Sequence, residues 1–177
     1  SDLPLDQQAA MIPEWCPDAK TVGLLYCSAE ANSQYQVDTV QAALEALGLT
    51  CTQYPFSDTN DMASVTQTAA DNSDVLYVPT DNTIANNTGI VDNICHGKIP
   101  VFAGEEGVCS GCGVATLSIS YYDLGVTTGQ MAVKILTGES NVAEMPIEYA
   151  PQFTKKYNPA ACEALGITVP EGYEAIA

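Results

Sequence analysis

Short apolar runs alternate with segments of helical periodicity along most of the chain. The first run, residues 22–26, ends abruptly in small and polar residues, and apolar side chains then recur three or four positions apart from Val37 to Leu47. Unbroken apolar runs are typical of parallel strands that helices cover on both faces, and the second spacing is typical of an amphipathic helix. The opening unit therefore predicts a strand over 21–26 and a helix over 32–47.

The same unit repeats downstream. We predict further strands over 49–54, 74–79, 99–103 and 114–119, the last as a candidate edge strand. We also predict helices over 84–95 and 121–137, and two more helices that end near residues 70 and 166. A short helix over 5–12 and a short strand over 147–149 complete the pattern. This alternation predicts an α/β fold, a three-layer, doubly wound parallel sheet with helices on both of its faces.

Charge narrows the classes of partner. The 177 residues include 5 basic and 22 acidic side chains, for a formal net charge of -17. Nucleic-acid phosphates and anionic lipids both require basic side chains, so we expect no nucleic-acid partner and no docking on a lipid surface. No apolar run approaches the length of a membrane span.

Cysteine is frequent, with seven in the chain. Cys109 and Cys112 form a C-x-x-C pair, a spacing found in disulfides, redox pairs and metal sites. There is no second such pair, and the single histidine, His96, follows Cys95 at the end of a predicted helix, which argues against zinc. A redox pair normally opens a helix, whereas this pair lies in a predicted glycine-rich loop, so we expect a local disulfide or two free thiols.

Motifs of catalysis are missing from the sequence. It contains no G-x-S-x-G, no H-E-x-x-H, no G-x-x-x-x-G-K-[ST] and no G-x-G-x-x-G that opens a helix. We expect His96 to make a favourable contact with a helix C-terminus, because a protonated imidazole is attracted to the partial negative charge there. We therefore predict no enzyme activity, no catalytic residue, no metal and no cofactor.

Polar side chains instead follow three of the predicted strands, where ligands settle in open α/β sheets. Hydroxyls, amides and helix N-termini bind carboxylates, and carboxylates bind ammonium groups, so the set suits a zwitterion such as an amino acid. In the alternative, each group of residues only caps its own helix. The candidates are Ser28, Glu30, Asn32 and Ser33 after the first strand, Thr80, Asp81 and Asn82 after the third, and Glu105 with Glu106 after the fourth.

Aromatic residues divide into two groups. Tyr26, Tyr77 and Phe102 lie inside predicted strands, where a place in the core is favoured. Tyr121 and Tyr122 open a predicted helix and are better candidates for lining an apolar or aromatic part of a ligand.

Several long motifs resemble one family. VGLLYCSAEANSQYQ, DVLYVPTDNTIA, IPVFAGEEG, ISYYDLGVTTGQMAVKILTGE and NPAACEALGITVP, in that order, are similar to bacterial ABC-transporter substrate-binding proteins that include binders of tryptophan, tyrosine and phenylalanine. The resemblance implies a type I periplasmic-binding-protein fold, in which two α/β lobes close on a ligand. It also implies export, a permease partner and, in Gram-positive members, a lipid anchor on an N-terminal cysteine.

The resemblance also assigns residues and segments. It places Ser28, Glu30, Asn32, Ser33, Thr80, Asp81, Asn82 and Glu105 at the cleft. Residues 1–20 become a lead-in or hinge and 21–120 one substrate-binding lobe, while 121–177 pack on or return to another lobe, which family members carry ahead of this segment. The apolar stripe of Tyr121–Thr137 would then need a cover, and we predict a homodimer or a rearranged packing.

Two other functions share such a fold. The first is the effector-binding domain of a transcription regulator, which would come with a helix-turn-helix that this sequence lacks. The second is a flavodoxin-like enzyme, which would need a glycine-rich phosphate-binding first turn, and residues 28–33 contain no glycine. The leading hypothesis is the extracytoplasmic solute-binding component of an ABC importer, with an aromatic amino acid as its ligand.

Overall fold

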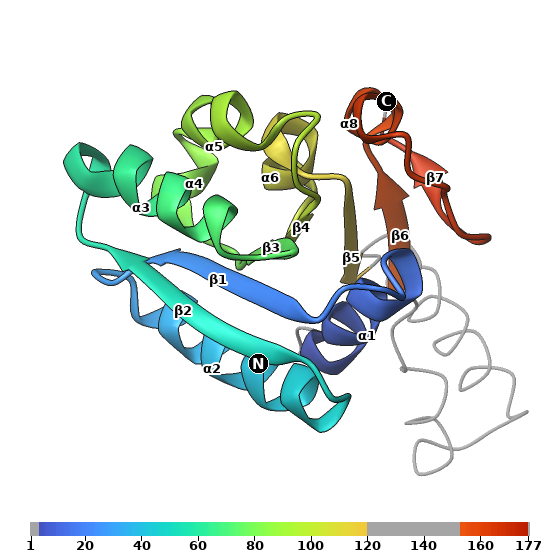
Figure 1. The fold of residues 1–177 in the computed structure, drawn as a ribbon, viewed down its shortest axis with the longest axis horizontal. Coiled ribbons are helices and arrows are strands. Elements are labelled where there is room, and N and C mark those ends of the chain that lie inside the picture. The colour runs from blue at the N-terminus through green and yellow to red at the C-terminus, as the bar shows by residue number, and fades with distance from the viewer. Residues whose placement is uncertain (1–3, 120–152, 177) are drawn as a thin grey trace, which may run out of the picture.

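A twisted sheet forms the middle layer of the molecule (Figure 1). The computed structural model describes residues 4–119 and 153–176. Within these residues the sheet has seven strands in the order β2-β1-β3-β4-β5-β6-β7. Five of them are parallel, from β2 to β5, and β6 runs antiparallel to β5. The strands are β1 (Thr21–Cys27), β2 (Thr50–Phe56), β3 (Val75–Val78), β4 (Val101–Ala103), β5 (Ala115–Ile119), β6 (Phe153–Tyr157) and β7 (Glu174–Ala175).

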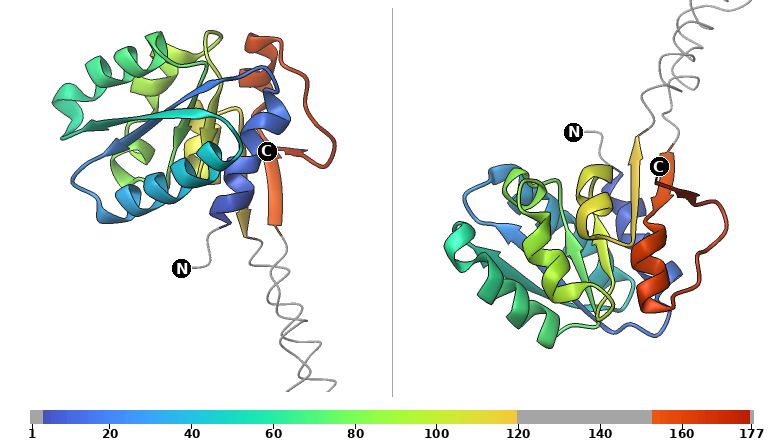
Figure 2. Two further views of the ribbon diagram at one scale, coloured as in Figure 1. Left: turned by 60° about the horizontal axis from the view of Figure 1, so that its bottom comes forward. Right: turned by 90° about the horizontal axis from the view of Figure 1, so that it is seen from above.

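Helices cover both faces of this sheet, and the views in Figure 2 show the two helical layers on either side of the strands. Side chains alternate along β1, so Leu24 packs with α1 and α2 while Leu25 packs with α3, α5 and α6. The fold is therefore the three-layer, doubly wound α/β arrangement that the sequence predicts. The helices are α1 (Leu5–Trp15), α2 (Ala31–Ala46), α3 (Thr59–Asp71), α4 (Asn82–Ala85), α5 (Thr88–Cys95), α6 (Glu106–Cys112) and α8 (Pro159–Leu165).

The strongest sequence patterns correspond closely to elements. The predicted strands over 21–26, 74–79 and 99–103 correspond to β1, β3 and β4, and the helix over 32–47 corresponds to α2. Tyr26, Tyr77 and Phe102 are buried, as expected of core residues. His96 caps the C-terminus of α5, where the sequence places it.

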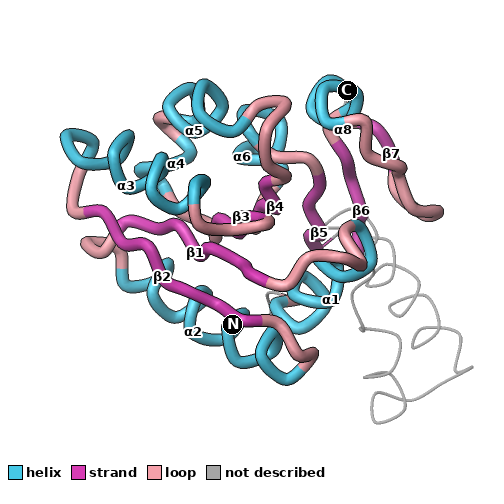
Figure 3. Tube along the Cα trace, viewed as in Figure 1, coloured by secondary structure: helices cyan, strands magenta, loops and turns pink. Residues whose placement is uncertain are grey.

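One predicted helix, 84–95, is two helices, α4 and α5. The break falls at Asn86 and Asn87 (Figure 3). The amide nitrogen Nδ2 of Asn87 donates a hydrogen bond of 2.8 Å to the Thr83 carbonyl, and such side-chain bonds compete with helical ones.

The segment from Glu106 to Cys112 is the helix α6, so the prediction of a glycine-rich loop here is wrong. Glycines lower helix propensity, but tertiary packing overrides this because Val108, Cys109 and Cys112 are buried against the sheet. Gly111 itself meets α5 closely, since an added Cβ would lie 2.4 Å from the Thr88 hydroxyl oxygen. The C-x-x-C pair therefore does lie on a helix, and both of its thiols are free.

The C-terminal part of the chain adds to the same sheet. β5 is an interior strand and not an edge strand, because β6 pairs along its whole length from Ala115↔Tyr157 to Ile119↔Phe153. Residues 153–157 and 174–175 thus extend this sheet. The division that the resemblance implies, in which 121–177 pack on or return to another lobe, stays a prediction. The backbone N–H and C=O groups on the side of β5 that faces away from β4 need hydrogen-bond partners, and β6 supplies them.

Several expectations fall outside the described residues. These are the helix and apolar stripe of Tyr121–Thr137, the homodimer based on it, the strand over 147–149, and the lining role of Tyr121 and Tyr122. They stay predictions. Among the helices that the structure does describe, none has the length and apolar character needed to cross a membrane.

Candidate functional site

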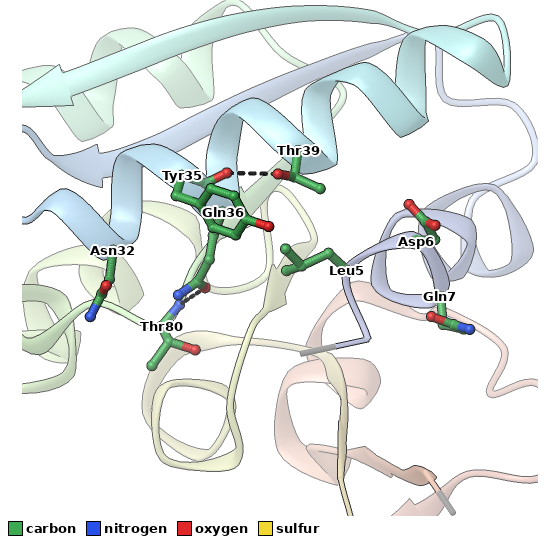
Figure 4. Close-up of a pocket in the computed structure, with 8 residues that line it drawn as sticks. All are labelled: Leu5, Asp6, Gln7, Asn32, Tyr35, Gln36, Thr39 and Thr80. Atoms are coloured by element: carbon green, nitrogen blue, oxygen red, sulfur yellow. Dashed lines mark hydrogen bonds between the residues drawn. The ribbon is translucent and has the colours of Figure 1, made fainter. Parts of the chain in front are cut away.

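A pocket of about 420 Å³ opens at the carboxyl edge of the sheet, between α1, α2 and the loop that follows β3 (Figure 4). The end of α1 forms one side, the exposed face of α2 forms the roof in this view, and Thr80 lies opposite. The lining residues are Leu5, Asp6, Gln7, Asn32, Tyr35, Gln36, Thr39 and Thr80. The pocket lies where parallel α/β sheets bind ligands.

One face of α2 supplies half of the lining. Asn32, Tyr35, Gln36 and Thr39 follow the helical spacing of three and four residues, so they share a face. Apolar residues of the same helix, such as Val37 and Leu44, are buried on the sheet side. Tyr35 is 62% exposed, one of three large hydrophobic side chains that are exposed among the described residues. The helix thus has a core face and a pocket face.

Hydrogen bonds fix both sides of the pocket. The buried Gln36 accepts a bond of 2.8 Å from the Thr80 backbone N–H, which ties α2 to the loop after β3. On α1, the buried Gln8 donates to the carbonyl oxygens of Gly104 (3.2 Å) and Leu117 (2.9 Å) and accepts from the Tyr77 hydroxyl (2.6 Å). These bonds hold α1 against β3, β5 and the residue after β4, and they place Leu5, Asp6 and Gln7 beside the pocket.

Asp81, directly after Thr80, is buried and fully engaged. Its Oδ2 accepts hydrogen bonds from the Cys27 backbone N–H (2.9 Å) and from the Ser33 hydroxyl (2.6 Å). Its Oδ1 accepts from the Ile84 backbone N–H (3.0 Å) and so caps α4. The side chain thereby joins the end of β1, the first turn of α2 and the start of α4.

Glu30 makes the reciprocal connection from the loop after β1. Its Oε1 accepts from the Asn82 backbone N–H (2.9 Å), and its Oε2 accepts from the Thr83 backbone N–H (3.0 Å) and hydroxyl (2.8 Å). Glu30 is also the N-cap residue of α2, yet it makes no side-chain bond to that helix. The carboxylate serves the neighbouring loop instead.

The pKa values of the two carboxyls are shifted in opposite directions. Partial burial alone would raise the pKa of Glu30, but hydrogen bonds with Asp81, Thr83 and Asn82 lower that pKa to about 2. Burial raises the pKa of Asp81 above its ordinary value, and the Glu30 carboxyl adds to the rise against the hydrogen bonds from Ser33 and Cys27.

A model of the ABC transporter substrate-binding protein family matches residues 1–177. The chain belongs to this family.

Relatives within the family are known by sequence and by structure. The chain is 32% identical over 146 residues to a tyrosine-binding protein from Clostridioides difficile (strain R20291), which covers 82% of this chain and 42% of that protein. It is 31% identical, with a TM-score of 0.75, to an ABC domain from Streptococcus pneumoniae solved in complex with L-Trp, over 98% of this chain and 62% of that one.

A ligand-free, open structure of a substrate-binding protein with adhesive properties from Clostridium difficile matches with a TM-score of 0.82 and 32% identity. That match covers 97% of this chain and 59% of the other. The chain therefore spans less than two thirds of the length of these substrate-binding relatives.

The structure of this family member separates the eight sequence-predicted site residues. Only Asn32 and Thr80 line the pocket. Glu30, Ser33, Asp81 and Asn82 make the hydrogen bonds described above, which matches the capping alternative for Asp81. Ser28 bonds to the end of β2, since its hydroxyl donates to the Phe56 carbonyl at 3.2 Å. Glu105 is the N-cap residue of α6 and makes no side-chain capping bond there.

Six lining residues escape a search confined to strand ends. Tyr35, Gln36 and Thr39 follow Asn32 at helical spacing, so extending the search along the polar face of α2 would find them. Leu5, Asp6 and Gln7 carry no such signal, because α1 reaches the pocket through a tertiary contact. In the described ranges, no three His, Cys, Asp or Glu side chains converge in a way that could hold a metal ion.

Proposed function

We propose that this chain is the ligand-binding part of the substrate-binding component of an ABC importer, and that it binds a free amino acid with an aromatic side chain. The pocket at the carboxyl edge of the sheet is the observation that carries the proposal. Its volume of about 420 Å³ falls in the range of small-molecule sites, and the family is one of substrate-binding proteins.

The lining of the pocket suits a zwitterion. Asn32, Gln36, Thr39 and Thr80 offer uncharged hydrogen-bonding groups for a ligand carboxylate, while Asp6 is the one carboxylate of the lining and attracts an ammonium group. Leu5 supplies an apolar surface. The chemistry of an amino acid is thus represented on the walls of a single pocket.

Tyr35 supports the choice of an aromatic ligand. Its ring lines the pocket and is largely exposed, so burying it against a second ring would remove apolar surface from water and add an aromatic contact. The tyrosine-binding relative and the relative solved with L-Trp have aromatic ligands by description. We therefore rank tryptophan, tyrosine and phenylalanine above the aliphatic amino acids.

Asn32 and Thr80 are the proposed direct contacts among the sequence-predicted residues. Ser28 and Glu105 lie at the same edge of the sheet, after β1 and β4, and are proposed as further contacts in the closed, two-lobed protein. Because the relatives are longer, we propose that a second lobe closes over this edge. We further propose that the whole protein is located outside the cytoplasm, is anchored by a lipid and binds the permease subunits of an ABC importer.

The solute-binding role is proposed in preference to the effector-binding domain of a transcription regulator. The family model and the relatives above 30% identity all describe substrate-binding or amino-acid-binding proteins. We propose no catalytic role for this chain.

Thermal melting of the complete encoded protein against each of the twenty amino acids tests the proposal. A ligand that binds only the folded state raises the melting temperature by mass action. We expect tryptophan, tyrosine or phenylalanine to raise it by several degrees at millimolar concentration, and calorimetry then gives the Kd.

Two variants locate the site in the same assay. Asn32→Ala and Thr80→Ala should weaken binding at least tenfold, whereas the matched control Asn60→Ala, in the first turn of α3 and outside the pocket, should bind like the parent protein. No shift with any amino acid would overturn the proposed ligand class. Equal binding by all three variants would move the site elsewhere.

A further inference from the structure

Two neighbouring loops exchange carboxylates at the edge of the sheet. Asp81, after β3, reaches the end of β1 and the first turn of α2, and Glu30, after β1, reaches the start of α4. We call these two side chains with Ser33, Asn82 and Thr83 the Glu30–Asp81 network. Its bonds between the two loops join residues that are 48 to 53 positions apart in the sequence. The network thus connects two loops that are far apart in the sequence.

The pocket residues are adjacent to this network in sequence. Asn32 immediately precedes Ser33, which donates to Asp81, and Thr80 immediately precedes Asp81. The Gln36 carboxamide holds Thr80 from the other side through the Thr80 N–H. The spacing between Asn32 on α2 and Thr80 on the next loop is therefore set by hydrogen bonds that lie just behind the pocket wall.

We infer that Glu30 and Asp81 are positioning residues, which hold Asn32 and Thr80 in a ligand-binding arrangement and do not themselves contact the ligand. The inference rests on the proposed function for the identity of the ligand. It rests on geometry for the rest, because Asp81 is 1% exposed and both of its oxygens accept hydrogen bonds from the protein. Both oxygens of Glu30 are occupied in the same way.

The alternative is a direct contact, in which one of these carboxylates binds the ligand ammonium group. The two roles differ in how the loss of affinity depends on that group. Loss of a positioning residue weakens the binding of every ligand that uses Asn32 and Thr80. Loss of a carboxylate that binds the ammonium group weakens only the binding of ligands that carry this group. A des-amino analogue of the bound amino acid separates the two roles.

The variants are Asp81→Asn and Glu30→Gln in the complete encoded protein, and Asp58→Asn is the matched control. Asp58 caps α3 at the same edge of the sheet by accepting from the Asn60 N–H, and it lies outside the pocket. All three variants remove one carboxylate that caps a helix. Glu30 is only partly buried, so Glu30→Gln keeps the test available if Asp81→Asn does not fold.

Calorimetry gives the first readout. We expect Asp81→Asn to weaken binding of tyrosine or tryptophan at least tenfold and Glu30→Gln three- to tenfold, with the same factors for 3-(4-hydroxyphenyl)propionate or indole-3-propionate. Asp58→Asn should bind within twofold of the parent protein. Parent-like affinity in both test variants would overturn the inference, and so would a loss confined to the ligands that carry an ammonium group.

Hydrogen exchange of the ligand-free protein gives a second readout that needs no ligand. Asp81→Asn and Glu30→Gln should speed amide exchange in peptides that contain Asn32 and Thr80, and Asp58→Asn should not. Unchanged exchange in both test variants would overturn the positioning role. If the parent protein binds no amino acid while exchange responds as expected, the proposed ligand is wrong and the positioning role stands.

Discussion

Two helices that begin at the same edge of the sheet are capped in different ways. α3 is capped locally, because Asp58 accepts from the Asn60 N–H while Asp61 accepts from the backbone of Ser57 and Asp58. α4 is capped by its own Asp81 and also by Glu30, which lies 52 residues earlier in the chain. A local cap stabilises one helix. A shared cap also fixes the position of one loop against another.

Because Glu30 bonds to the start of α4, α2 is left without a side-chain capping bond at its own N-terminus. Glutamate is a poor N-cap residue, and the side chain of Glu30 makes no bond to the helix that it precedes. Natural sequences depart from local rules of this kind at functional sites. The departure falls on the helix whose exposed face lines the pocket, while α3 follows the local rule and lines no part of that pocket.

The largest effect on stability is expected from Asp81→Ala. The change leaves the N–H groups of Cys27 and Ile84 without an acceptor and the Ser33 hydroxyl with only a long bond of 3.5 Å to the Thr80 carbonyl. Each unsatisfied buried group is costly. We expect the free energy of unfolding to fall by about 3 kcal/mol, measured by urea denaturation. A loss as small as that of a surface cap would show that the shared cap is no stronger than a local one.

Asp58→Ala should cost less. It removes a single helix cap at the surface, which is typically worth about 1 kcal/mol in the free energy of unfolding. Urea denaturation should show that loss, and calorimetry should show ligand affinity unchanged. A drop in affinity would mean that the two helix starts are coupled after all.

Glu30→Gln gives a comparison that depends on pH. The folded pKa of Glu30, about 2, lies below its ordinary value of 4.5, so its ionised form stabilises the folded state. That contribution is complete above pH 4.5 and is lost as the pH falls toward 2. We expect the variant to be less stable than the parent by about 1 kcal/mol at pH 6.

The gap in melting temperature between the two proteins should then narrow as the pH is lowered from 5 to 2.5. Asp61, whose pKa is also lowered by the backbone N–H groups of Asp58 and Ser57, is present in both proteins and leaves each with an acid transition. A gap that stays constant across this range would contradict the depressed pKa of Glu30.

The smallest effect on stability is expected from Tyr35→Ala. The ring is largely exposed, so the free energy of unfolding should change by no more than about 0.5 kcal/mol. Affinity for an aromatic amino acid should fall up to about tenfold, and affinity for alanine should not change. Tyr35→Phe is the matched control and should bind like the parent. Equal losses for aromatic and aliphatic ligands would remove the stacking role.

Sequence patterns anticipated the elements whose own residues determine them. The buried strands β1, β3 and β4 are unbroken apolar runs, and α2 has a clear apolar stripe. α6 was missed because its glycines argue against a helix, and only its packing against the sheet and α5 explains it. The sequence predicts no strand over 153–157, where Lys155 and Lys156 interrupt the apolar pattern, although β6 pairs with all of β5.

The candidate site shows the same limit. The rule that ligands bind beyond strand ends led to Asn32 and Thr80, which line the pocket, and also to Asp81, which is buried beneath it. Nothing in a linear sequence distinguishes a carboxylate that faces solvent from one that faces the N–H groups of a neighbouring loop. The contribution of α1 to the pocket could not be anticipated either, because it depends on bonds from Gln8 to distant strands.

Those bonds bear on how the chain assembles. Gln8 bonds to Gly104 and Leu117, which follow it by 96 and 109 residues, although it lies in the first helix. Contacts between distant residues form late, because the intervening chain must first be ordered. We expect α1 to dock late, after β4 and β5 have joined the sheet, although it precedes both of them in the chain. The pocket beside α1 would then be the last part of the described lobe to take shape during refolding.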